Sequence, residues 1–198
     1  MELVTEQEKF WNDEAGWAAD YRRRNQLNYA LRVPFWTNIL ALTGAQSILE
    51  VGTNTGANLK ALRAINRQLD LKGIDVSYDA CIEAVMAGLD VEQVRGADVG
   101  AKWPGKFDLS FTCGCLIHVA DADLSTVMDS IIASSKRYVL AVEYESEHTE
   151  AVSYRDHADR LWRRPFGRLY EEKGLKLVDV RDAGEGFDRC TSWLLTAP

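Results

Sequence analysis

The chain has 198 residues and a formal net charge of −7, and 46% of its residues are hydrophobic. This size and balance indicate one globular domain with a real core rather than a disordered chain. The acidic charge argues against a nucleic-acid-binding protein, because such binding needs clustered Lys and Arg. No apolar run approaches the ~20 residues of a membrane span, and the polar N-terminal stretch is no signal peptide. We therefore expect a cytoplasmic protein without membrane contact.

The four cysteines do not follow a metal-binding pattern. Cys113 and Cys115 are close in sequence, but no CxxC pair occurs. A zinc site needs paired ligands at a recognisable spacing, completed by His or further Cys. We expect free thiols in a reducing compartment.

Three charged segments have both a functional and a structural interpretation. Glutamates alternate in the segment 143–148, which ends in His148, and could imitate a metal cluster; a solvated strand edge is the preferred interpretation, so no metal is expected. The basic segments 22–24 and 160–168 fit solvated helix faces or an anionic small-molecule substrate.

The first predicted elements are helical and span residues 5–43. Thr5 can cap a helix over residues 6–17, and apolar residues recur at helical spacing from Leu27 to Leu42. Pro34 lies in that second stretch and should start or kink a helix there.

From residue 47 onward, short apolar strands alternate with helices. We expect strands at residues 47–51, 69–74, near Val94, and at 107–112, 138–142, 175–180 and 191–195. We expect helices at 57–65, 78–87 and 124–133, and a helical region over 151–173. This alternation predicts an α/β, Rossmann-like, mainly parallel sheet in a single domain covering residues 1–198. The last two strands have no helix between them and should form an antiparallel hairpin at one edge.

The turn after the first strand carries the strongest functional signal, EVGTNTG, from Glu50 to Gly56. Glycine lets a ligand come close to the backbone, and the following helix offers unpaired amides. A dinucleotide fingerprint would read GxGxxG. Here Asn54 takes a place between Gly52 and Gly56, and asparagine tolerates left-handed backbone angles.

Acidic residues follow the next two strands. Asp75 ends the second strand, where a carboxylate can accept both ribose hydroxyls of an adenosine cofactor. The alternative, a helix cap, suits Ser77 better. Asp98 follows the third strand, where it could read an adenine amino group or simply be solvated.

The turn after the fourth strand should line the reacting centre, because ligands of open α/β sheets bind outside the carboxyl ends of the strands. Residues 112–118 read TCGCLIH. His118 could remove a proton from a substrate hydroxyl or amine, or could only shape the pocket.

The segment 150–173 is interpreted as an insertion on the substrate side of the domain. It concentrates Tyr, Arg and His near its start. Tyr154, Arg155 and His157 are the candidate substrate contacts, and an exposed amphipathic helix is the alternative.

The motifs ILEVGTNTGANL and FDLSFTCGCLIHV, with the strand order, resemble class I S-adenosylmethionine (SAM)-dependent methyltransferases. Both ends, TEQEKFWNDEAGWAADYRRRN and YRDHADRLWRRPFGRLYEEKGLKLVD, are similar to small methylases associated with pseudaminic acid biosynthesis. The resemblance covers nearly the whole chain. It implies a class I methyltransferase sheet, with residues 1–43 as an N-terminal helical lid.

The resemblance also implies site residues. It places Gly52, Thr53, Asn54 and Gly56 around the methionine part of SAM, Asp75 at the ribose, Asp98 and Val99 at the adenine, and Cys113 beneath the sulfonium. Trp11, Tyr21 and Arg24 would belong to the lid. The chain departs from the family at residues 15–19, AGWAA, where relatives have a more regular acidic and aromatic stretch.

The sequence therefore predicts methyl transfer from SAM to an oxygen or nitrogen of a small molecule, of a sugar-acid or secondary-metabolite type, with His118 as the base. A non-catalytic protein that binds SAM or its product is the main alternative. An NAD-dependent oxidoreductase fits the glycine turn and terminal hairpin less well, and the acidic charge disfavours a nucleic-acid methyltransferase.

Overall fold

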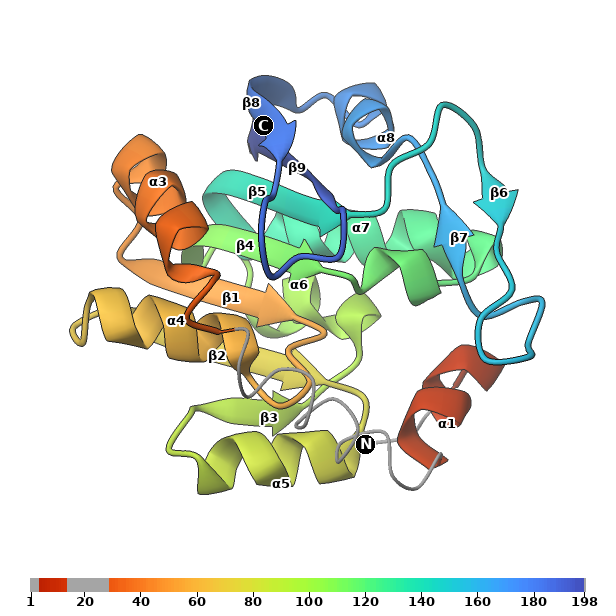
Figure 1. The fold of residues 1–198 in the computed structure, drawn as a ribbon, viewed down its shortest axis with the longest axis horizontal. Coiled ribbons are helices and arrows are strands. Elements are labelled where there is room, and N and C mark those ends of the chain that lie inside the picture. Colours follow the sequence, from red (N-terminus) through yellow and green to blue (C-terminus); the bar gives the residue numbers. More distant parts are fainter. Residues whose placement is uncertain (1–3, 14–28, 198) are drawn as a thin grey trace.

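The computed structural model describes residues 4–13 and 29–197, and its centre is a seven-stranded sheet (Figure 1). The strand order is β3-β2-β1-β4-β5-β9-β8. The strands are β1 (Ser47–Val51), β2 (Asp70–Asp75), β3 (Val91–Gln93), β4 (Phe107–Cys113), β5 (Ser135–Glu143), β8 (Lys176–Asp182) and β9 (Thr191–Thr196). The first five are parallel, and β9 runs antiparallel to both β5 and β8. The predicted parallel sheet with an antiparallel edge hairpin is confirmed.

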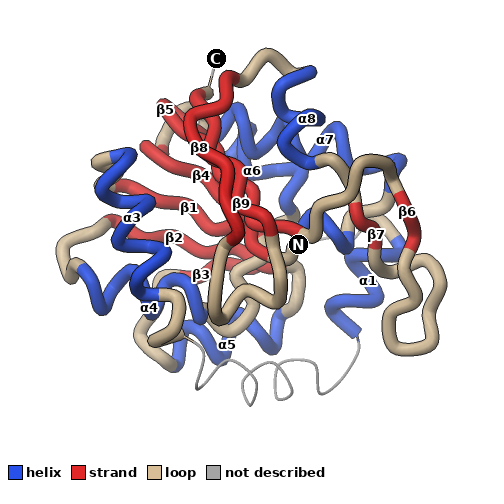
Figure 2. The backbone as a smooth tube through the Cα atoms, turned by 45° about the horizontal axis from the view of Figure 1, so that its top comes forward, coloured by secondary structure: helices blue, strands red, loops and turns tan. Residues whose placement is uncertain are grey.

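Helices cover both faces of the sheet, as Figure 2 shows. Side chains of α3 (Val33–Thr43), α4 (Ala57–Ile65) and α5 (Tyr78–Met86) join the core on one face. Side chains of α6 (Val99–Lys102), α7 (Asp121–Ser134) and α8 (Phe166–Glu172) join the core on the other. Strands covered on both faces need nearly continuous apolar sequence, which is why β4 reads FDLSFTC and buries most of its side chains.

The second predicted N-terminal helix is α3, and it belongs to the layer beside the sheet. Pro34 lies in its first turn, where a missing N–H costs no hydrogen bond, and Gly44 ends it in a left-handed conformation. Phe35, Trp36 and Ile39 are buried in the core. The lid hypothesis for residues 1–43 therefore depends on α1 (Glu6–Asp13).

Helix α1 begins with a capping box. The Thr5 hydroxyl accepts a hydrogen bond from the Glu8 N–H at 3.2 Å, and the Glu8 carboxylate accepts one from the Thr5 N–H at 3.0 Å. The predicted cap at Thr5 is thus present. The predicted helix end at residue 17 lies outside the described residues.

The helical prediction for residues 151–173 is wrong over most of its length. Strand β6 (Glu150–Ala151) pairs with β7 (Trp162–Arg163) as a two-stranded hairpin, and only α8 is helical. Arg155 and Asp156 have φ angles of 49° and 66°, which a right-handed helix cannot contain. A tight local turn, stabilised by contacts with distant segments, overrides the helical periodicity here.

None of the described helices has the length and apolar character needed to span a membrane. Within the same residues, no group of His, Cys, Asp and Glu side chains is arranged to hold a metal ion.

Candidate functional site

A cavity of about 500 Å³ lies at the carboxyl ends of the parallel strands. The turns after β1, β2, β3 and β4 line it, together with residues of α1, of the segment 144–161 and of the β8–β9 loop. Figures 1 and 2 show α1 beside the β6–β7 hairpin on this side of the sheet. The position is the one expected for ligands of open α/β sheets.

The glycine turn between β1 and α4 needs its glycines for both conformation and packing. Gly52 and Gly56 have φ angles of 78° and 80°. A Cβ atom on Gly52 would lie 2.4 Å from Cys115 Sγ, and one on Gly56 would lie 2.2 Å from a methyl carbon of Leu89. Asn54 has a φ of 49°, so it adopts the left-handed conformation expected of it. Gly52 and Asn54 line the cavity, whereas Gly56 packs behind it.

Asp75 lies at the end of β2 and fixes this turn. One carboxylate oxygen accepts a hydrogen bond from the Asn54 N–H at 2.7 Å, and the other accepts one from the Ser77 N–H at 2.9 Å. Burial raises the pKa of Asp75, and these backbone donors counteract the rise. The helix cap is Ser77, whose hydroxyl accepts from the Ala80 N–H, as predicted. Each Asp75 oxygen keeps capacity for a further donor from the cavity.

Glu50, buried beneath the turn, heads a polar network that the sequence analysis did not identify. Its carboxylate accepts hydrogen bonds from Thr53 Oγ1 and Asn58 Nδ2, both at 2.7 Å. The side-chain oxygen Oδ1 of Asn58 in turn accepts hydrogen bonds from Arg32 at 2.9 Å and from the Trp36 indole N–H at 3.2 Å. Burial raises the pKa of Glu50 to about 7, although these donors oppose the shift. The sequence feature that could have revealed this network is Asn58, an asparagine in the first turn of the helix that follows the glycine turn.

A second buried glutamate holds the turn after β4. The Glu143 carboxylate accepts hydrogen bonds from the N–H groups of Cys115, Leu116 and Ile117 at 3.1–3.3 Å. Burial raises its pKa to about 7. The prediction of a solvated edge at residues 143–148 is wrong for this residue, which is 1% exposed, because its partners are backbone donors rather than water.

Arg164 holds the same turn from the other side. It donates to the carbonyl oxygens of Leu116 at 3.0 Å and Val119 at 2.8 Å, and to the Asp121 carboxylate at 2.7 Å. Its side chain is fully buried. Neither interpretation of the basic segment 160–168 fits Arg164, because it is neither solvated nor part of the cavity lining. Arg163 and Arg168 are solvated, with 51% and 72% of their side chains exposed.

His118 lies on this turn, in η2 (Leu116–His118), and lines the cavity. Its Nδ1 lies 2.6 Å from the carbonyl oxygen of Arg160. Because a carbonyl only accepts, Nδ1 carries the proton and Nε2 has the lone pair when the ring is neutral. Burial lowers the pKa of His118 to about 4, so the ring is neutral near pH 7.

Aromatic rings join α1 to the turn and to the insertion. The ring centroids of Trp11, His118 and Tyr154 lie 4.4–5.9 Å apart in each pair. We call these three rings the aromatic wall, and all three line the cavity. The Gln7 side chain also donates to the Asp159 carbonyl at 2.6 Å, across 152 residues of sequence.

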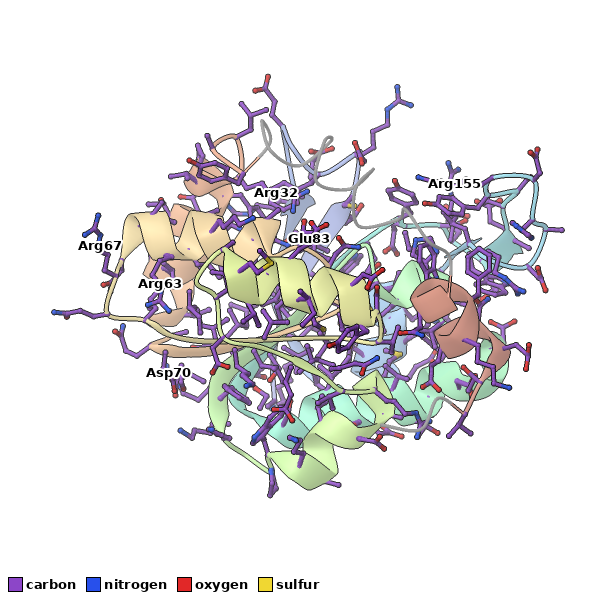
Figure 3. The ribbon with its side chains drawn as sticks, turned by 90° about the horizontal axis from the view of Figure 1, so that it is seen from below. Arg32, Arg63, Arg67, Asp70, Glu83 and Arg155 are labelled. Carbon is purple, nitrogen blue, oxygen red and sulfur yellow. The ribbon has the colours of Figure 1, made fainter. Side chains whose placement is uncertain are left out.

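The structure brings together only part of the predicted site. Trp11, Gly52, Thr53, Asn54, Asp75, Cys113, His118 and Tyr154 line the cavity; Gly56, Asp98, Val99, Arg155 and His157 do not. Asp98 is half-exposed beside Arg95, and Val99 is buried in the core. Arg155 and His157 are exposed on the insertion, where Figure 3 shows Arg155. Tyr21 and Arg24 lie outside the described residues.

The four cysteines are all free thiols, as expected. Cys113, Cys115 and Cys190 line the cavity. Burial raises the pKa of each thiol well above its ordinary value. They are therefore protonated near pH 7 and contribute apolar surface rather than nucleophiles.

No protein-family model and no curated protein matches this sequence. Solved structures of similar fold include the magnesium protoporphyrin IX methyltransferase of Synechocystis with bound SAM, at 12% identity and a TM-score of 0.67, with 100% of each chain covered. The 1,6-didemethyltoxoflavin-N1-methyltransferase of Burkholderia thailandensis, with S-adenosylhomocysteine (SAH), matches at 16% identity and a TM-score of 0.68, over 100% of this chain and 92% of that one. A SAM-dependent methyltransferase of Clostridium acetobutylicum matches at 13% identity and a TM-score of 0.66, with 93% of this chain and 99% of that chain covered. The chain therefore has the Rossmann-like fold of class I SAM-dependent methyltransferases.

Proposed function

We propose that this protein transfers a methyl group from SAM to an oxygen or nitrogen atom of a small molecule. The observation that carries the proposal is the pairing of the glycine turn with Asp75. The turn presents open backbone to the cavity at Gly52, and Asp75 fixes Asn54 while facing the same space. An adenosine cofactor needs this combination of close backbone approach and a carboxylate for its ribose.

The residues of the cavity fit SAM. The two Asp75 oxygens each accept one backbone N–H, which leaves acceptor capacity for two ribose hydroxyls. The stretch after β3 that lines the cavity, from Val94 to Ala97, suits the adenine better than Asp98 and Val99 do. Arg32 lines the cavity beside the Glu50 network; Figure 3 shows it on the side of the α3–α4 layer. Its cation suits the carboxylate of the methionine part.

When bound, SAM supplies an electrophilic methyl group on a positively charged sulfur. The chain's own contribution is to position the acceptor and exclude water. The turn from Cys113 to Ala120 faces the reacting centre, held in place by Glu143 and Arg164. His118 stays our candidate base, because its Nε2 has the lone pair available to accept a proton.

The nature of the acceptor is a further proposal. Both a sugar-acid and a secondary-metabolite type fit a small cavity. The two described arginines of the lining already have partners, since Arg95 pairs with Glu8 at 2.7 Å and Arg32 donates to Asn58. Arg32 is assigned to the methionine carboxylate, so the described lining offers no further arginine to an anionic acceptor. We also propose that nucleic acid is not the substrate, given the net charge of −7, and that the protein works in the cytoplasm, where its thiols stay reduced.

Calorimetry tests the proposal with SAM, SAH and NADH as ligands of the purified protein and of two variants. We expect SAM and SAH to bind, and we expect Asp75→Ala to weaken both. Asp79→Ala serves as the control, because Asp79 is exposed on α5 and lies outside the lining. Binding of NADH alone would support the oxidoreductase and contradict the proposal.

A non-catalytic SAM-binding or SAH-binding protein is the second candidate. It shares every cofactor contact, so binding alone does not separate it from an enzyme. Release of SAH from SAM in the presence of an acceptor supports the enzyme. Turnover of SAM with an acceptor therefore decides between the enzyme and the non-catalytic binding protein.

A further inference from the structure

The acceptor side of the cavity is lined mainly by rings. The aromatic wall of Trp11, His118 and Tyr154 comes from α1, the turn after β4 and the insertion, three segments far apart in sequence. Tyr144, after β5, and Phe187, in the β8–β9 loop, line the same cavity. Flat apolar surfaces of this kind bind planar molecules by offset stacking and edge-to-face contacts.

Polar groups are sparse on this side. The Nδ1 of His118 and the side-chain amide N–H of Gln7 already donate to backbone carbonyls of the insertion. Among the described residues, other polar atoms on this side include Gln7 Oε1, Trp11 Nε1, His118 Nε2, the hydroxyls of Tyr144 and Tyr154, and the Asp188 carboxylate. A buried sugar acid would bring several hydroxyls and a carboxylate, each of which needs a partner. The lining suits a molecule with few polar groups.

His118 also limits the chemistry of the acceptor. Burial lowers the pKa of His118 to about 4, although the hydrogen bond to the Arg160 carbonyl opposes this shift, so the ring is neutral near pH 7 and is a weak base. General bases work best with a pKa near the working pH. A weak base can orient a nucleophile, but it does not remove the proton of an aliphatic hydroxyl. An acceptor whose own proton is acidic therefore suits this site.

We propose that the methyl acceptor is a planar aromatic or heteroaromatic molecule with an acidic hydroxyl or ring N–H, stacked on the aromatic wall. This inference rests on the proposed function and names the substrate class of the same site. The ionised oxygen or nitrogen uses its lone pair to form the bond to the methyl carbon. The carbon–sulfur bond breaks and its electron pair stays on sulfur as neutral SAH. His118 Nε2 accepts the acceptor's proton and passes it on to solvent.

The test measures SAH release from SAM with two panels of acceptors. The planar panel contains para-nitrophenol, umbelliferone and xanthine, and the sugar panel contains glucuronic acid and N-acetylneuraminic acid. We expect SAH and a methylated product, identified by mass spectrometry, with the planar panel only. Methylation of a sugar acid, or no methylation of any planar probe by protein that binds SAM, overturns the inference. Failure to bind SAM or SAH overturns the proposed function instead, and calorimetry shows which has failed.

Variants of Tyr154 separate stacking from folding. Tyr154→Leu should raise KM for the planar acceptor about three- to tenfold, the usual worth of an aromatic contact, with KM for SAM unchanged. Tyr154→Phe keeps the ring and should keep the wild-type KM. Tyr138→Leu is the matched control, because Tyr138 is a half-buried tyrosine of β5 outside the lining. An acceptor KM that does not change in Tyr154→Leu contradicts the stacking.

Discussion

The two sides of the cavity are built in different ways. Around the glycine turn the partners are close in sequence, since Glu50 bonds Thr53 and Asn58, and Asp75 bonds Asn54 across 21 residues. On the acceptor side they are distant. His118 bonds Arg160 across 42 residues, and Gln7 bonds Asp159 across 152. The glycine turn and Asp75 are thus positioned by consecutive strand–turn–helix units, whereas the acceptor side exists only when remote segments meet. Arg32 and Arg95 also have remote partners, the Gly186 carbonyl and Glu8.

Arg164→Met gives the largest expected effect and breaks the acceptor side alone. It removes the donors for the Leu116 and Val119 carbonyls in a buried place. Each buried polar group left unsatisfied costs about 1–3 kcal/mol, so we expect the free energy of unfolding to fall by about 2–5 kcal/mol. Urea unfolding measures the loss. Hydrogen exchange should accelerate in residues 115–121 and stay unchanged in residues 52–56.

The matched control for this variant is Arg163→Met. Arg163 is the preceding arginine, half-exposed, and 3.7 Å from Glu150. Exposed ion pairs contribute little, so we expect a change within about 0.5 kcal/mol. Equal losses from the two variants, or faster exchange in the glycine turn of Arg164→Met, would contradict the separation of the two sides.

Asn58→Ala is the equivalent change on the cofactor side. It removes the bridge between Glu50 and the Arg32–Trp36 pair, all in a buried place. We expect a loss of about 2–3 kcal/mol in the free energy of unfolding and weaker SAH binding by calorimetry. Asn66→Ala, at the end of the same helix and outside the lining, should leave SAH binding unchanged. Unchanged SAH affinity in Asn58→Ala would show that the network supports the fold only.

Gly52→Ala probes a close contact between the two sides. The added Cβ would lie 2.4 Å from Cys115 Sγ, at a φ of 78°. Left-handed backbone costs a non-glycine residue about 1–2 kcal/mol, and overpacking adds to it. We expect a loss of about 2 kcal/mol, part of which Cys115→Ala restores by removing the sulfur. Strictly additive effects of the two substitutions would mean that the sides do not touch as described.

Sequence predicts the glycine turn and the end of β2 for the same physical reason. Strand, glycine turn and helix are local patterns, so Gly52, Asn54 and Asp75 were identifiable from spacing, and the fold from its alternation of elements. Of the aromatic wall, His118 and Tyr154 were predicted as acceptor-side residues, and Trp11 was predicted as part of the lid over the cofactor. Local periodicity suggested a helix where the β6–β7 hairpin forms, and charge suggested solvation for Glu143 and Arg164. Their burial depends on backbone groups that only the folded chain brings within reach.

The pH dependence of stability compares the two sides through their buried glutamates. Burial raises the pKa of both Glu50 and Glu143 from 4.5 to about 7. The folded state therefore binds more protons than the unfolded state in that window, and stability is lost as the pH rises through it. His118 acts in the opposite sense, because its pKa falls from 6.5 to about 4; its contribution is present above pH 6.5 and is lost as the pH falls.

The balance of these three groups predicts a net slope. Each group contributes about 1.4 kcal/mol per pH unit where its protonation differs between the two states. Two fully buried glutamates against one histidine leave a fall of about 1.4 kcal/mol per unit between about pH 5 and pH 6. Glu145, a half-buried residue whose pKa is also raised to about 7, adds to this fall. Urea unfolding at these pH values measures it. His118→Ala removes the opposing contribution and should steepen the fall, whereas His148→Ala, an exposed histidine, should not. A wild-type protein that gains stability over this range would mean that the acceptor-side histidine outweighs both carboxyl groups.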